Sequence, residues 1–356
     1  MNDKKQLDIE LMRIFAAFFV IFKHTNNNGF FLFSQYEYGS LQFWVYLIPS
    51  IFCKFSVPLF FSIAGALLLN REPEPLPRLW IHRICRIGAV LLAWSFFYYM
   101  VGVVRGSETF RLKTFLATLY TSNWNFSFWY LYAYVAFLVT LPLLQRLAQG
   151  MSNRDFLYFW GVYILFSPFL QTVQYLLLQN RASLNDHLIP SWISERILFY
   201  PLLGYFLRYR IRDFWNRKRL TVLWMVNIAC ILLACWMTYR EAVVTGKCTE
   251  EFHNTFVAIN CIAVFVSCQH LFDKGNPDKR VQKLICSLGS STLGVYLMHV
   301  LFLNRIPVIS KLLDIMRLQW HINYMVSAFL YCGFIFVICY VVTLVMKKIP
   351  LLRQLV

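Results

Sequence analysis

The sequence predicts an all-α integral membrane protein, a bundle of about ten transmembrane helices. Two observations of composition point to this class. Of 356 residues, 59% are hydrophobic and only 14% are charged, and the mean hydropathy is +0.54. Such values lie outside the usual range of soluble globular domains. A third observation is that several apolar runs are long enough to cross a hydrocarbon core about 30 Å thick.

The apolar runs differ in character along the chain. The first carries acidic residues and an arginine and has no small-residue cleavage site, so we expect it to remain as a helix. The sixth is short and interrupted by Pro201 and Gly204, and the ninth contains Gly289 and Gly294. Broken segments of this kind line cavities rather than face lipid. The predicted segments span about 7–25, 48–69, 83–104, 127–147, 155–175, 196–209, 221–239, 255–272, 288–306 and 325–346.

Residues 1–356 are predicted to form a single membrane domain, because no repeat, low-complexity stretch or appended soluble domain interrupts the short loops. The ten cysteines show no Cys-x-x-Cys spacing, and we expect no bound metal. No Walker loop, paired catalytic carboxylates or HExxH motif is present.

The net charge of +17 follows from the loops. Alternate loops differ about twofold in Lys and Arg content, which predicts that both termini are cytoplasmic. The basic residues are divided among helix ends, so a nucleic-acid partner is not expected. The richer set includes Lys4, Lys5, Arg71, Arg78, Arg83, Arg86, Arg208 and Lys274, and the poorer set includes Arg105, Arg181, Arg240 and Arg305.

Arg13 and His24 are ionisable residues in the first segment, eleven positions apart. That spacing is three helical turns plus about 20°, so both lie on one face, about 16 Å apart. Ionisable groups inside a bilayer are functional candidates. His24 is either a general base or a histidine hydrogen-bonded at a helix end. Arg13 must meet an anion or pair with an acid such as Glu10.

Further candidates are less distinctive. Arg83 and Arg86 face the same way as a helix begins, and they form either a phosphate clamp or a topological signal. Trp129 and Tyr130 fit an interfacial aromatic belt or a cavity wall. His299 is a lone intramembrane histidine that could simply be a packing residue.

Together these features resemble the acyltransferase 3 family, multi-pass membrane enzymes that O-acylate cell-envelope glycans. Each match is degenerate, but they run in order over nearly the whole chain. Two departures are Ala64, where the family commonly has Ser, and the lack of an SGNH-type domain after the tenth segment. The matching elements are Asp8, Arg13 and His24; residues 57–65; Arg83 and Arg86; residues 128–131 with 141–144; residues 200–207; and residues 294–299.

The resemblance implies an O-acyltransferase of the cytoplasmic membrane, with acetyl-CoA or another acyl-CoA as donor and no metal. Its acceptor would be a glycan or lipid-linked sugar. The alternative is a small-solute transporter that uses the same polar track.

The resemblance also implies roles for individual residues. We further expect a continuous tunnel lined by Arg13, His24 and parts of the third, fourth and ninth segments, with its inner mouth ringed by Arg83 and Arg86. The implied roles are a general base for His24, donor binding or site orientation for Arg13, contacts to donor phosphates for Arg83 and Arg86, and cavity lining for Trp129, Tyr130 and His299.

Overall fold

The computed structural model describes residues 6–178, 183–273, 275, 277–304 and 306–356. The fold is all-helical, with 81% helix and no strand among the described residues, which confirms the predicted class. Lys4, Lys5, Arg181, Lys274 and Arg305, which entered the charge comparison, lie outside the described residues. The α-helices are α1 (Leu7–Lys23), α2 (Leu41–Phe52), α3 (Ser56–Leu68), α4 (Leu76–Arg78), α5 (Cys85–Val104), α6 (Leu112–Thr121), α7 (Trp129–Gly150), α8 (Asn153–Ile164), α9 (Leu170–Leu178), α10 (Arg196–Tyr209), α11 (Arg217–Thr245), α12 (Val257–Leu271), α13 (Lys279–Gly289), α14 (Thr292–Asn304), α15 (Pro307–Asp314) and α16 (Tyr324–Met346).

Several helices are long and apolar enough to cross a membrane, so the chain is a multi-pass membrane protein. Among the described residues there are six such stretches, and α13 with α14, bent by 58°, makes a seventh. The chain therefore breaks beside Gly289, at the start of the predicted ninth segment, whereas α14 runs unbroken through Gly294. Helices α1, α10 and α12 also coincide with predicted segments, but with 17, 14 and 15 residues they are shorter than the six stretches. The total of about ten crossings and the cytoplasmic termini remain predictions. The six stretches are Leu41–Leu68, Leu76–Val104, Phe126–Gly150, Asn153–Leu178, Arg217–Thr245 and Tyr324–Met346.

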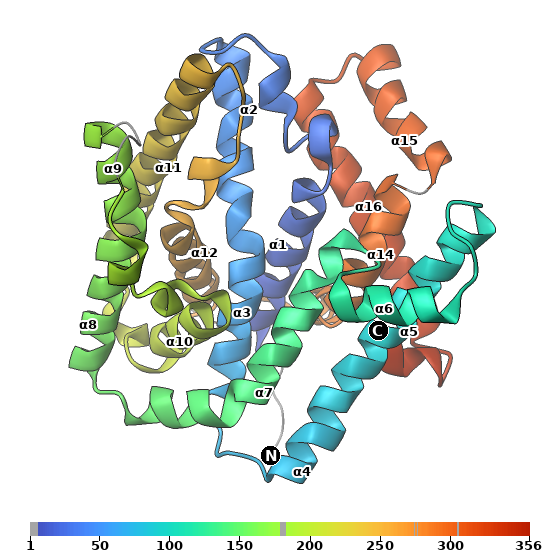
Figure 1. The fold of residues 1–356 in the computed structure, drawn as a ribbon, viewed down its shortest axis with the longest axis horizontal. Helices are drawn as coiled ribbons and strands as arrows, with labels where there is room; N and C mark the ends of the chain where they lie inside the picture. Colours follow the sequence, from blue (N-terminus) through green and yellow to red (C-terminus); the bar gives the residue numbers. More distant parts are fainter. Residues whose placement is uncertain (1–5, 179–182, 274, 276, 305) are drawn as a thin grey trace.

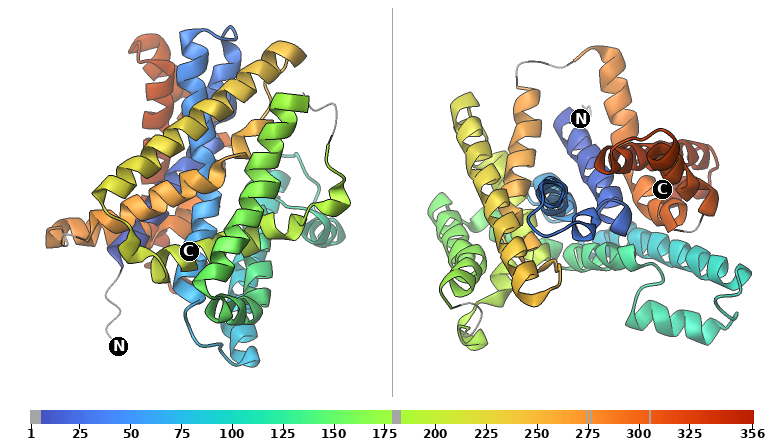
Figure 2. Two further views of the ribbon diagram at one scale, coloured as in Figure 1. Left: turned by 90° about the vertical axis from the view of Figure 1, so that its left-hand side faces the viewer. Right: turned by 90° about the horizontal axis from the view of Figure 1, so that it is seen from above.

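Helices α1 and α3 stand in the middle of the bundle (Figure 1). Helices α8 to α12 lie on one side of them and α14 to α16 on the other, and the view from above shows the same division (Figure 2). We call the end of the bundle where α1 begins the Asp8 end and the opposite end the Lys23 end. Lys347, after α16, donates to the carbonyl of Ser290, and Gly289 lies against Glu10 of α1, so α16 finishes at the Asp8 end.

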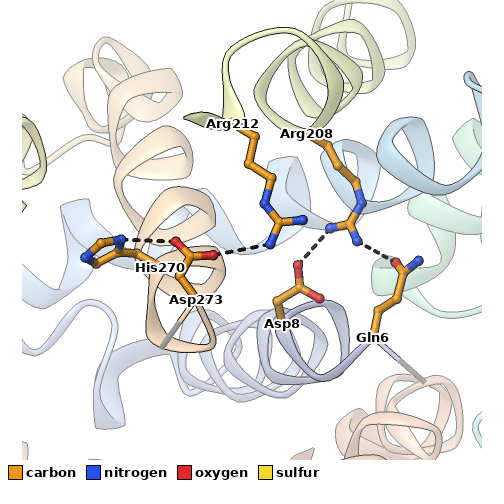
Figure 3. Close-up of polar contacts among 6 residues, drawn as sticks. All are labelled: Gln6, Asp8, Arg208, Arg212, His270 and Asp273. Carbon is orange, nitrogen blue, oxygen red and sulfur yellow. Dashed lines mark hydrogen bonds and ion pairs between the residues drawn. The ribbon is translucent and has the colours of Figure 1, made fainter. Parts of the chain in front are cut away.

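Ion pairs join three helices at the Asp8 end (Figure 3). Arg208 of α10 donates from Nη1 to Asp8 Oδ2 of α1 at 2.7 Å, and both side chains are nearly buried. Arg212, just after α10, binds Asp273, which also contacts His270 of α12. Because α10 meets the start of α1 with its own C-terminal turn, the two helices run antiparallel.

Helices α3 and α10 pack backbone against backbone. A Cβ atom at Gly65 would lie 1.9 Å from the carbonyl oxygen of Pro201, and one at Gly204 would lie 1.8 Å from that of Ser62. Small residues permit this close approach between membrane helices. The prediction that Pro201 and Gly204 interrupt the sixth segment is wrong, because α10 runs unbroken through both. Proline removes one backbone donor, but a membrane helix packed against neighbours tolerates that loss.

We expect Gly65→Ala and Gly204→Ala to destabilise the protein by about 1–3 kcal/mol each, because the added methyl group forces the helices apart. Thermal unfolding of the detergent-purified variants measures the effect. Gly333→Ala in α16 is the matched control, since a Cβ atom there meets nothing within 4 Å. Equal melting temperatures for all three variants would contradict the backbone contact.

Candidate functional site

A cavity of about 450 Å³ opens between α1, α5, α7 and α14, and we call it the Arg13 cavity. Helix α1 contributes Arg13, and α7 contributes Tyr130 and Tyr134. A π-helical turn before α5 brings Arg83 to the cavity, and the first turn of α5 brings Arg86. The remaining lining includes Phe60, His82, Ile87, Val90, Gly289, Ser290, Thr292, Leu293, Tyr296, Gln354 and Val356.

The arginines of this cavity differ in their partners. Arg13 donates from Nη1 to Glu10 Oε1 at 2.9 Å, which is the ion pair that the sequence spacing allows. Arg83 binds both carboxylate oxygens of Glu74 through two guanidinium nitrogens. Arg86 is exposed and has no hydrogen-bond or ion-pair partner in the described part of the chain. The charge of Arg86 is therefore the one most available to an anion.

His24 caps the C-terminus of α1 and forms a hydrogen-bonded pair with His299 of α14. His24 Nδ1 lies 2.7 Å from His299 Nε2, and His299 Nδ1 lies 2.6 Å from the carbonyl oxygen of Tyr296. Because a carbonyl can only accept, His299 carries its proton on Nδ1. In the neutral pair, His299 Nε2 accepts from His24 Nδ1, a tautomer assigned from the hydrogen-bond network. The lone pair of His24 is then on Nε2, the nitrogen that His299 leaves free.

A second cavity, of about 190 Å³, contains three cationic side chains, and we call it the Lys23 cavity. These side chains are Lys23 at the end of α1, Lys54 before α3 and Arg196 at the start of α10. The Arg196 guanidinium lies 4.9 Å from the centre of the Trp129 ring. The remaining lining includes Ser56, Val57, Pro58, Tyr163, Ser167, Ser194, Tyr200, Asn254 and Val257.

The sequence-predicted residues fall into three groups along α1. Although His24 is adjacent in sequence to Lys23, it lines neither cavity. The Arg13 cavity therefore corresponds to the part of the predicted tunnel near the arginines, and its continuation to His24 stays a prediction. Arg13, Arg83, Arg86 and Tyr130 line the Arg13 cavity, His24 and His299 form the pair, and Trp129 lines the Lys23 cavity.

Three features of the candidate site escaped the sequence analysis. Lys23 and Lys54 lie within predicted membrane segments, so the rule that selected Arg13 would also have selected them. Glu74 lies in a Pro-rich loop with no pattern that marks it as the partner of Arg83. The contact between Arg196 and Trp129 joins residues far apart in the chain, and no local signal indicates it.

Comparison with known proteins identifies the chain at the level of a family. The family model Acyl_transf_3, described as an acyltransferase domain, matches residues 6–344, nearly the entire chain. No curated protein and no solved structure matches the chain. The family match confirms the resemblance seen in the sequence.

The Arg83 guanidinium holds the pKa of Glu74 below its ordinary value of 4.5. The stabilisation by this ion pair is thus fully present above the pKa of the unfolded carboxyl group and is lost as the pH falls through the lowered folded pKa. We expect the wild-type protein to have a higher melting temperature than Glu74→Gln near neutral pH. This difference in melting temperature should vanish on strong acidification. Thermal unfolding across a pH series tests this. Glu72→Gln, which removes an exposed carboxylate of the same loop but not the partner of Arg83, is the control.

Proposed function

We propose that this chain, which belongs to the acyltransferase family Acyl_transf_3 over residues 6–344, is a membrane O-acyltransferase that uses a cytoplasmic acyl-CoA. Its acceptor would be a hydroxyl group of a cell-envelope glycan or lipid-linked sugar, and acetyl-CoA would be the donor. The observation that carries the proposal is the His24–His299 pair, which lies next to residues lining two cationic cavities.

The Arg13 cavity is the donor site of this proposal. Its volume of about 450 Å³ is typical of small-molecule sites. Arg86 and Arg83 supply guanidinium groups suited to phosphate oxygens. Tyr130, Tyr134 and Tyr296 form an aromatic wall that suits the pantetheine arm. Since Tyr296 also holds His299 through its carbonyl oxygen, this wall extends toward His24.

His24 acts as the general base. Its Nε2 accepts the proton of the acceptor hydroxyl as the oxygen attacks the thioester carbonyl carbon. The carbon–sulfur bond then breaks, and the departing CoA thiolate takes the proton back from His24 Nε2. His299 is a positioning residue in this scheme, because it keeps the His24 proton on Nδ1 and the lone pair on Nε2.

The Asp8 end faces the cytoplasm in this proposal. Loops at that end hold the larger share of Lys and Arg, as the positive-inside rule requires. The Arg83–Arg86 mouth would then meet acyl-CoA directly, and Lys23 would lie toward the acceptor side. Transfer of radiolabel from acetyl-CoA to an envelope fraction, dependent on the purified protein, tests the function. Solute uptake into proteoliposomes without any acyl transfer would favour the transporter instead.

We expect His24→Ala to lower the transfer rate by about 10²–10⁴-fold, because the hydroxyl proton loses its acceptor. His24→Gln should be equally inactive, since an amide forms hydrogen bonds but is no base near neutral pH. His187→Ala, an exposed histidine far along the chain, is the matched control. Turnover of labelled acetyl-CoA by folded protein is the measurement, and near-wild-type turnover of His24→Ala would refute the role.

The positioning role of His299 calls for a separate pair of variants. His299→Gln keeps an acceptor for His24 Nδ1 and should retain much of the turnover. His299→Leu removes the acceptor and should lower kcat with little change in the donor KM, and should shift the pH profile of kcat. If His299→Leu and His299→Gln have the same kcat and pH profile, His299 has a packing role and does not position His24.

We expect Arg86→Ala to raise the KM for acetyl-CoA by about ten- to a hundredfold, the cost of a charge-assisted phosphate contact. Arg83→Ala should have a smaller effect, because Glu74 already neutralises much of that charge. Arg78→Ala, exposed in the same segment and outside the cavity, is the control. A donor lacking the 3′-phosphate should show a smaller difference between wild type and variants. An unchanged KM in Arg86→Ala would limit these arginines to a topological role.

A further inference from the structure

The Lys23 cavity gathers positive charge that the protein leaves largely uncompensated. Lys54 is paired with Glu250, which lies outside the lining. Lys23 is half-buried and has no hydrogen-bond or ion-pair partner among the described residues. Arg196 contacts only the face of Trp129 among the polar and ring contacts described for it. No described lining residue is acidic, so the cavity carries a net positive charge.

The position of Lys23 makes this arrangement costly without a ligand. An ammonium group in a partly buried site of a membrane protein is expensive unless an anion accompanies it. The C-terminus of α1 offsets only part of that cost, about 0.3–1 kcal/mol for an exposed cation there. Ser56 provides an independent observation: its side chain is fully buried at the cavity wall, and its hydroxyl has no hydrogen-bond partner in the described structure. Two unsatisfied groups of different chemistry thus meet in one cavity.

The lining selects the class of ligand. Lysine and arginine together bind phosphate or carboxylate oxygens, and serine and asparagine side chains can complete the hydrogen bonds. A volume of about 190 Å³ has room for roughly six water molecules, enough for a small anionic group or part of one sugar but not for a polymer. A long acceptor must therefore place only one anionic group here.

The cavity is also adjacent to the reacting base. Lys23 is bonded directly to His24, so their Cα atoms are about 3.8 Å apart. On the other side, Trp129 follows Phe126 by three residues, and the Phe126 ring packs edge-on against His24 with centroids 4.8 Å apart. An anion held by Lys23 would therefore fix its own molecule close to the His24 imidazole.

We propose that the Lys23 cavity binds a phosphate or carboxylate group that the acyl acceptor carries near its reacting hydroxyl. The substrate class is thus an anionic saccharide or a phosphate-linked sugar rather than a neutral glycan. The inference rests on the proposed acyltransferase function. It gives Lys23 and Arg196 the role of selecting the acceptor, while Arg83 and Arg86 hold the donor.

Calorimetric binding to purified protein without acyl-CoA tests this inference separately from catalysis. The probes are inorganic phosphate, methyl glucuronide and its neutral counterpart methyl glucoside. We expect at least one anionic probe to bind and the neutral sugar to bind at least about tenfold more weakly. Added salt should weaken the binding of the anionic probe. The tighter of phosphate and glucuronide identifies the group on the acceptor.

Variants locate the binding. Lys23→Met should weaken the anionic probe by about tenfold or more, and Lys23→Arg should restore it. Lys247→Met, an exposed lysine outside the cavity, is the matched control and should bind as wild type does. Because phosphate also suits the Arg13 cavity, only binding lost in Lys23→Met supports the proposal. Should Lys23→Met fail to fold, Arg196→Gln takes its place.

Three results would overturn the inference: no anionic probe binds, glucoside binds as well as glucuronide, or the variant of the cavity cation binds as wild type does. Those results would leave the proposed acyltransferase intact if labelled acyl transfer persists. Conversely, anion binding that is lost in Lys23→Met, with no transfer from any acyl-CoA, would keep the anion site but overturn the proposed function and the role of the anion as part of an acyl acceptor.

Discussion

The backbone contact between α3 and α10 is the constraint on which both cavities depend. With Gly65 against Pro201 and Gly204 against Ser62, the two helices meet at backbone distance and leave no room for a side chain between them. Helix α3 begins in the Lys23 cavity and sends Phe60 into the Arg13 cavity, while α10 begins with a cation of the Lys23 cavity. At the other end, two carbonyls at the C-terminus of α3 accept from two glutamines of α7. Two segments that carry the family resemblance, 57–65 and 200–207, are therefore the surfaces that join these helices, and the glycines in them serve packing.

Partners divide the charged residues of the bundle into two kinds. Asp8 with Arg208 and Glu10 with Arg13 are matched pairs at the Asp8 end, where each charge has its counterpart within the protein. Arg86 and Lys23 lack such counterparts in the described structure, and each lines a cavity. An isolated charge is costly in a bilayer, so under the proposed function the paired residues hold the fold and the unpaired ones meet a ligand. Arg13 and Arg83 are each paired and each also lines the cavity.

Much of the fold was readable from the sequence, because apolar length and glycine placement are local signals. The all-helical class and the break beside Gly289 were predicted, and the ordered motifs indicated the family that the comparison confirmed. The reading of Pro201 as a break was wrong, because the neighbouring helix that tolerates it is distant in sequence. The pairing of His24 with His299 joins residues 275 positions apart, and no spacing rule specifies it. Likewise, the separation of Trp129 and Tyr130 into different cavities depends on helices that only the folded bundle brings together.

The hydrogen bond from His299 to the carbonyl of Tyr296 limits how many protons the histidine pair can store. His299 Nδ1 donates its proton to the carbonyl, and His24 Nδ1 and His299 Nε2 share the proton between the rings. Only His24 Nε2 is left to accept a further proton. Once His24 Nε2 is protonated, the positive charge can lie on either ring, because a small shift of the bridging proton along the 2.7 Å contact moves the charge from His24 to His299. A second proton would place two positive rings in contact. The pair can thus take up one proton, which matches the single proton that, in the proposed mechanism, leaves the acceptor hydroxyl and returns on the CoA thiol.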